Sequence, residues 1–98
     1  MQTTLNKDGG KLTIAVSGRV DTTTAPEFEK TIFDNIEGVS ELVLDLKEMP
    51  YTSSAGLRVL LKAQKAMSAQ GSMKLVNVCS DVSEVFDMTG FSDILTIE

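Results

Sequence analysis

Apolar and polar residues alternate over residues 11–18, which predicts a half-buried β-strand with one apolar face. That face comprises Leu12, Ile14 and Val16. A shorter, threonine-rich run over residues 2–6 predicts a strand before it. The segment 7–10 joins the two runs and ends in two glycines, which accept the positive φ that tight hairpin turns need. We therefore expect the chain to begin with an antiparallel hairpin.

Apolar residues next recur at helical spacing, and this spacing predicts a helix that ends near Gly38. The apolar positions are Ala25, Phe28, Ile32 and Ile36. Thr24 is the expected N-cap, and Pro26 suits the first turn because it has no N–H group to leave unbonded. Glu27 follows Thr24 by three residues, as in a capping box.

The run 41–46 is apolar on both faces except at Asp45, which is typical of a central strand in a parallel sheet covered by helices. Further along, the pattern predicts a helix over 55–70, a strand over 73–78, a helix over 81–88 and a last strand over 94–97. The order β-β-α-β-α-β-α-β predicts a single-domain α/β fold over residues 1–98, with a mixed sheet of four or five strands.

Composition narrows the chemistry that the chain can perform. Its 98 residues include no histidine, which excludes a Ser-His-Asp or Cys-His pair and the usual structural zinc sites. Cys79 is the single cysteine, so it forms no internal disulfide and suits a reducing cytoplasm. Because no histidine can activate Cys79, we interpret it as a small core or loop residue.

Charge and hydropathy bear on the partners. The net charge of −5 opposes binding to a nucleic-acid backbone, which relies on clustered lysine and arginine. The first eight residues contain no apolar run of the signal-peptide kind, and no segment approaches the ~20 apolar residues of a membrane span. We therefore expect a cytoplasmic domain with no nucleic-acid partner and no membrane insertion.

Three carboxylates lie near predicted strand ends, namely Asp21, Asp45 and Glu48. Carboxylate oxygens bind divalent cations, so a small metal-dependent enzyme that uses Asp21 and Asp45 is one hypothesis. The same residues are also ordinary at strand ends and in loops, and we favour that interpretation. Neither of the glycine-rich phosphate-binding motifs occurs, and we expect no cofactor and no resident metal.

Three hydroxyl side chains, Thr52, Ser53 and Ser54, stand in a row where the long helix is expected to begin. One hydroxyl suffices to cap a helix, at about 1 kcal/mol, so capping does not explain all three. Gly56 in the first turn costs up to ~1 kcal/mol relative to alanine. A glycine at this position either lets another molecule approach the backbone or packs against a neighbouring strand.

The helix that follows carries two adjacent apolar stripes that together exceed the ~100° of a one-sided surface helix. One stripe comprises Leu57, Leu60, Leu61 and Gln64, and the other Val59, Ala63 and Ala66. Two interpretations remain open. The helix is wedged between two layers of the domain, or it exposes an apolar strip beside the serines for a partner.

These residues resemble the STAS-domain family, and within it the anti-sigma factor antagonists. The resemblance covers essentially the whole chain, so residues 1–98 are expected to form one STAS domain with a STAS-like sandwich. It rests on Gly18-Arg19-Val20-Asp21, Thr24-Ala25-Pro26, Leu44-Asp45-Leu46 and, above all, Tyr51-Thr52-Ser53-Ser54-Ala55-Gly56-Leu57-Arg58-Val59-Leu60-Leu61.

The resemblance implies a phosphorylation site. In well-known members the turn reads Asp-Ser-Ser-Gly, and its first serine is phosphorylated by the partner anti-sigma factor, a serine kinase. Alignment on Gly56 places that serine at Ser54, with Ser53 as the alternate, whereas the family's aspartate falls at Ser53 and its second serine at Ala55. The residues implied in partner binding are Asp21, Thr52, Ser53, Ser54, Ala55, Gly56, Leu57 and Arg58.

The implied function is that of an anti-sigma factor antagonist, which binds an anti-sigma factor and so frees a sigma factor. Phosphorylation of Ser54 would switch it off, and a serine phosphatase would restore it. Ser54 has no adjacent base, so the chain is expected to be a substrate and not an enzyme. An alternative within the same fold is a STAS subunit of a larger assembly, such as a lipid-transport ATPase or a signalling complex, that acts as a docking module.

Overall fold

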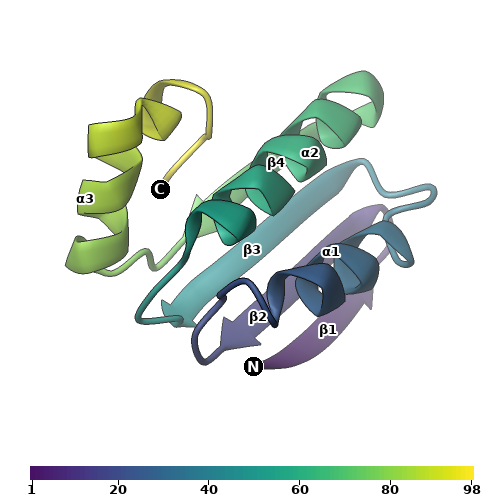
Figure 1. The fold of residues 1–98 in the computed structure, drawn as a ribbon. Coiled ribbons are helices and arrows are strands. Elements are labelled where there is room, and N and C mark those ends of the chain that lie inside the picture. Colours follow the sequence, from purple (N-terminus) through teal and green to yellow (C-terminus); the bar gives the residue numbers. More distant parts are fainter.

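The computed structural model describes residues 1–98, and its elements follow the predicted order up to the last one (Figure 1). They are β1 (Gln2–Asp8), β2 (Lys11–Ser17), α1 (Ala25–Phe33), β3 (Glu41–Glu48), α2 (Ser54–Gln70), β4 (Ser72–Val76), α3 (Ser80–Thr89) and a 3-10 turn, η1 (Phe91–Asp93). None of these helices combines the length and the apolar character that a bilayer crossing would need.

The four strands form one sheet in the order β1-β2-β3-β4. The β1–β2 pair is antiparallel, as the expected hairpin requires, whereas β2–β3 and β3–β4 are parallel. Helices α1 and α2 supply the crossovers that parallel neighbours need. The register places Ile14, Leu44 and Leu75 side by side across three strands. The predicted mixed sheet of an α/β domain is confirmed.

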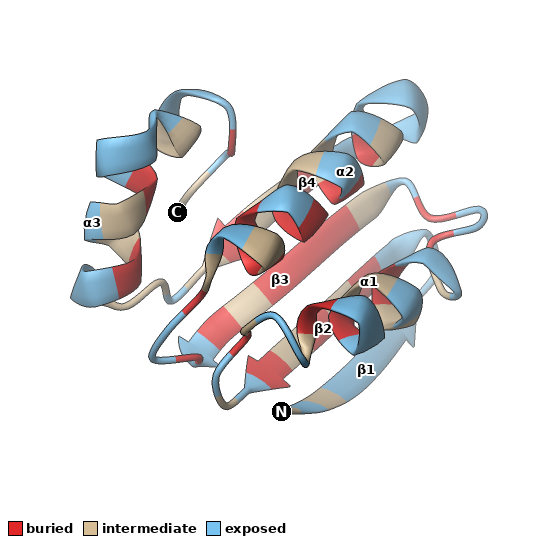
Figure 2. Cartoon of the chain, in the orientation of Figure 1, coloured by how far each residue is buried: buried red, intermediate tan, exposed pale blue.

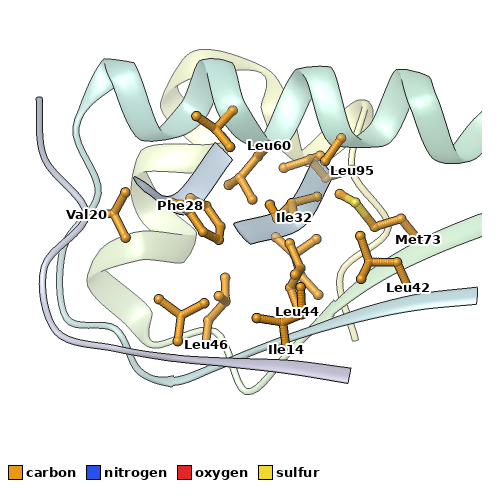
Figure 3. Close-up of a cluster of buried hydrophobic side chains, with 14 of the residues drawn as sticks. Ile14, Val20, Phe28, Ile32, Leu42, Leu44, Leu46, Leu60, Met73 and Leu95 are labelled. Carbon is orange, nitrogen blue, oxygen red and sulfur yellow. The ribbon is translucent and has the colours of Figure 1, made fainter. Parts of the chain in front are cut away.

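The hydrophobic core lies between the sheet and the helices α1 and α2, whose buried sides face the strands (Figure 2). Phe28 and Ile32 of α1, Leu60 of α2 and Leu44 of β3 all belong to this core (Figure 3). The broad apolar surface of α2 is mostly interior, with Leu57, Val59, Leu60, Ala63 and Met67 buried. Most of this surface therefore packs inside the domain. The helix is not wedged between two layers, because α2 lies beside α1 on one face of the sheet and its Arg58, Lys62 and Lys65 are exposed.

The predicted last strand, over residues 94–97, is wrong. Gly90, at φ 80°, ends α3 in the left-handed conformation, and a 3-10 turn follows. Only Ile97 forms an isolated bridge, with Leu75 at the edge of β4. The Leu75 amide donates to the Thr96 carbonyl oxygen at 2.9 Å. The chain meets β4 only in its last few residues, which is too short an approach for a ladder of hydrogen bonds.

Two details predicted for α1 are also wrong. The helix ends at Phe33 and not near Gly38, because the chain turns after it while Ile36 still reaches the core. Thr24 occupies the N-cap position, but its hydroxyl makes no capping hydrogen bond, so no capping box forms. Instead this hydroxyl accepts a hydrogen bond from the Asp21 amide at 2.8 Å.

Candidate functional site

The loops that lead into α1 and α2 run side by side beyond the ends of β2 and β3 (Figure 1). The Val20 amide donates to the Tyr51 carbonyl oxygen at 3.1 Å, and the Ser53 amide donates to the Val20 carbonyl oxygen at 2.8 Å. Val20 and Thr52 form a parallel bridge. This backbone pairing fixes the serine-containing turn against the segment that carries Asp21.

The structure separates the two serines of this turn. Ser53 is the N-cap of α2, with extended backbone, and its hydroxyl accepts a hydrogen bond from the Gly56 amide at 3.4 Å. Ser54 is the first helical residue, is exposed, and has a hydroxyl with no hydrogen-bond partner within the chain. Ser53 therefore caps α2, and Ser54 presents a free hydroxyl at the N-terminus of the helix.

Gly56 packs tightly against the same turn. A Cβ atom at this position would lie 2.2 Å from Thr52 Oγ1 and 2.9 Å from Val20 Cγ1, closer than real side-chain contacts allow. The glycine therefore lets the first turn of α2 rest directly on the paired loops. Of the two readings of Gly56, the structure supports packing within the domain.

Three of the residues expected at the partner interface have buried side chains or backbone, namely Thr52, Gly56 and Leu57. Their buried atoms position the turn, and a direct contact of these three residues with a partner stays a prediction. Asp21, Ser53 and Ala55 are half-buried, whereas Ser54 and Arg58 are exposed. The accessible part of the expected interface therefore centres on Ser54.

Asp21 organises the loop before α1. Its Oδ1 accepts hydrogen bonds from the Thr23 hydroxyl at 2.6 Å, the Thr23 amide at 2.9 Å and the Thr24 amide at 3.0 Å. These bonds, led by the Thr23 hydroxyl and the Thr24 amide, lower the pKa of the Asp21 carboxyl from its ordinary value of 3.8 to about 2. Asp21 is thus a carboxylate at neutral pH, held by threonines next to the serine turn.

The sequence interpretation overlooked Arg19 and Tyr51 as members of this site. The Arg19 guanidinium lies over the Tyr51 ring, 4.2 Å from its centroid, and both side chains are exposed. In the sequence, Arg19 is part of the motif Gly18-Arg19-Val20-Asp21 and Tyr51 is the first residue of the turn, with no signal that relates the two. No local pattern links them, because the contact arises from the pairing of two loops some thirty residues apart in sequence.

A groove of about 340 Å³ begins beside the serine turn and runs between α1 and α2. Ala55 and Arg58 line it from α2, and Ala25 lines it from α1. Lys62 Nζ and Glu29 Oε1 form an ion pair across it at 3.0 Å. Arg58 therefore stands at the border between the serine turn and this groove.

The family model for the STAS domain matches residues 2–98. The chain belongs to the STAS domain family. It is 35% identical to BtrV of Bordetella bronchiseptica, which is named as an anti-sigma factor antagonist, over 99% of this chain and 85% of the relative. It is 32% identical to the anti-sigma-B factor antagonist of Bacillus subtilis, over 86% of this chain and 78% of the relative.

The fold agrees with solved STAS structures. An anti-sigma factor antagonist from Mycobacterium paratuberculosis superimposes with a TM-score of 0.89 at 23% identity, covering 98% of this chain and 83% of that chain. This agreement in fold covers nearly the whole STAS domain described above.

The remaining candidates lie elsewhere in the STAS domain. Asp45 Oδ1 accepts hydrogen bonds from the Lys47 amide and from Asn77 Nδ2, each at 3.1 Å. The structure brings no three acidic, cysteine or histidine side chains together where they could hold a metal ion. Cys79 is half-buried, and its Sγ lies 3.6 Å from the Met49 carbonyl oxygen, which agrees with a packing role.

Proposed function

We propose that this STAS domain is an anti-sigma factor antagonist that works in the cytoplasm. In its unphosphorylated form it binds an anti-sigma factor that is also a serine kinase, through the surface around Ser54, and a sigma factor is released. Phosphorylation of Ser54 by that kinase ends the complex, and a serine phosphatase restores it. The relatives named as anti-sigma factor antagonists, which match most of the chain, support this proposal.

The single observation that carries the choice of residue is that the two serines have different roles in the structure. Ser53 is engaged as the helix cap, whereas the Ser54 hydroxyl is exposed and unbonded. The positive end of a helix dipole accepts an added anion, so a phosphate at Ser54 would leave α2 intact. Phosphorylation of Ser54 would therefore add negative charge to the surface without destabilising α2.

The loss of partner affinity that a phosphate at Ser54 would cause can be estimated from electrostatics. A phosphoserine adds about −1.5 to −2 charges at neutral pH. A −2 group at ~6 Å from a partner carboxylate experiences roughly 5 kcal/mol of repulsion at an effective dielectric constant of ~20. Since ~1.4 kcal/mol corresponds to a tenfold change in affinity, one such contact converts a tight complex into a weak one.

In the proposed reaction this chain is a substrate. The Ser54 hydroxyl has no hydrogen-bonded base within the chain to take its proton. The kinase must therefore supply ATP, Mg²⁺ and the general base that accepts the proton as the hydroxyl oxygen attacks the γ-phosphorus.

The test combines phosphorylation and binding. The purified chain is incubated with the host's sigma-regulating serine kinases and ATP, and phosphopeptides are identified by mass spectrometry. We expect one phosphate at Ser54, which is absent from Ser54→Ala and present in Ser53→Ala. By titration calorimetry, Ser54→Asp should bind the kinase at least tenfold more weakly, whereas Ser68→Asp, an exposed position far along the same helix, should bind as the wild type does.

Two outcomes would contradict the proposal. One is wild-type affinity of Ser54→Asp for the kinase. The other is copurification of the chain with subunits of a transport ATPase or signalling complex and with no sigma-regulating kinase, which would support the alternative of a docking subunit.

A further inference from the structure

The chain contains only two arginines, and both flank the serine turn. Arg19 precedes the bridge residue Val20, and Arg58 follows Ser54 by four residues, which is about one helical turn. The whole chain has a net charge of −5, with 14 acidic residues against 9 basic ones. Both arginines of this acidic chain therefore belong to segments that meet at the serine turn, Arg19 beside the Val20–Thr52 bridge and Arg58 in the second turn of α2.

Neither arginine is neutralised by the chain itself. The four ion pairs of the structure are all made by lysines, and none involves Arg19 or Arg58. Arg19 instead stacks on Tyr51, at 4.2 Å from the ring centroid. Stacking uses the face of the guanidinium and leaves its N–H donors free at the edge, where they match a carboxylate in a bidentate pair.

We propose that Arg19, Tyr51, Ser54 and Arg58 form a docking surface, here called the arginine-flanked surface, that binds an acidic segment of the partner protein. A partner carboxylate pairs with each guanidinium, and the tyrosine ring holds Arg19 in place. Arginine and tyrosine are the residue types in which binding energy concentrates at protein interfaces. The proposal rests on the proposed function and adds to it the chemistry of the partner.

Charge complementarity decides between the possible occupants of this surface. A nucleic-acid backbone needs many clustered cations, and this surface offers only two unpaired guanidinium groups on a chain of net charge −5, whereas each guanidinium suffices for one carboxylate of a protein segment. An acidic segment needs only the local match that the arginine-flanked surface supplies.

The same surface explains how a phosphate at Ser54 would act twice. Residues four apart on a helix are neighbours, so the phosphate pairs with Arg58 and removes that donor from the partner. It also repels the carboxylate that Arg58 would otherwise attract. One modification thus removes an attraction and adds a repulsion at the same point.

The first experiment needs no kinase and tests the surface directly. Because the chain has two arginines, the ¹⁵N-labelled protein shows two Arg Nε–Hε signals, which are followed by NMR at low salt. The probe is a blocked tetraglutamate peptide, with tetraglutamine as its matched control. We expect saturable shifts of both arginine signals with tetraglutamate only, and at least threefold weaker binding by Ser54→Asp. Shifts confined to lysine-bearing segments, or tighter binding of a duplex DNA, would overturn the proposal.

The second experiment uses the serine kinase that phosphorylates the chain. We expect Arg19→Gln and Arg58→Gln each to weaken the complex about tenfold and to reduce its salt dependence. Lys65→Gln, which removes an exposed unpaired charge from the same helix, should leave the affinity unchanged. If the kinase phosphorylates Ser54 and both arginine variants bind normally, the arginine-flanked surface is refuted and the proposed function stands. If tetraglutamate binds as expected but no kinase acts on Ser54, the reverse holds.

Discussion

Replacement of Gly56 by alanine should destabilise the domain, although alanine is the better helix former. The added Cβ would lie 2.2 Å from Thr52 Oγ1, whereas ordinary contacts begin at 3.4 Å, so helix and turn must separate by about 1.2 Å. The added Cβ would also lie 2.9 Å from Val20 Cγ1, so a shift of the helix toward Val20 would not relieve the overlap. Thr52 is buried, so its side chain has little freedom to rotate away.

The magnitude is a difference of two effects. Overpacking of this kind costs about 1–3 kcal/mol, and the gain in helix propensity returns at most ~1 kcal/mol. We therefore expect Gly56→Ala to lower the free energy of unfolding by about 1–2 kcal/mol. For a domain of this length, that loss corresponds to a fall in Tm of roughly 5–15 °C.

Urea unfolding followed by circular dichroism measures this change, and Lys65→Gly compared with Lys65→Ala calibrates helix propensity at an exposed site of α2. Thr52→Ala removes the atom nearest to the new Cβ, so the double variant Thr52→Ala/Gly56→Ala should lose less stability than the two single changes added together. An unfolding free energy of Gly56→Ala equal to or above that of the wild type would refute the packing argument.

Three further predictions concern single side chains. Gly71→Ala should cost about 3 kcal/mol or more in urea unfolding, because its Cβ would lie 1.9 Å from the Ser40 carbonyl oxygen, a backbone atom that cannot rotate away. Ser53→Ala should cost about 1 kcal/mol through loss of the cap, whereas Ser54→Ala should stay within about 0.5 kcal/mol of the wild type; equal losses would contradict the assignment of the cap. The folded-state pKa of Asp21 is lowered to about 2, so its carboxylate stabilises the fold above pH 4, and this contribution is lost as the pH falls from 4 to 2. In Asp21→Asn the urea midpoint should depend less on pH over that interval. A pH dependence equal to that of the wild type would count against the hydrogen-bonded carboxylate.

Much of the fold was predictable because its signals are local. The alternation over β2 and the helical spacing over α2 each report which face of an element is apolar, and the structure confirms both elements. The last strand was mispredicted because strand pairing at the edge of a sheet depends on tertiary contacts and not on local pattern. Its apolar residues at 94–97 reach the core through Leu95, but the edge of β4 meets the chain only at an isolated bridge with Ile97.

The candidate site was predictable only in part. The sequence pointed to the turn from Thr52 to Ser54 and to the family that the later comparison showed. It did not distinguish Ser53 from Ser54 as the cap, since either hydroxyl suits that position. It also predicted a capping role for Thr24, whose hydroxyl is in fact bonded to the Asp21 amide.

The sequence by itself determined the order of the elements up to α3, the acidic character of the chain and the position of the serine turn, because periodicity, composition and motif spacing are properties of neighbouring residues. Only the tertiary structure decided which serine is free, why Gly56 must lack a side chain, and that Arg19 stacks on Tyr51. These depend on the backbone pairing of two distant loops around Val20 and Thr52, and no local pattern encodes which atoms such a pairing brings into contact.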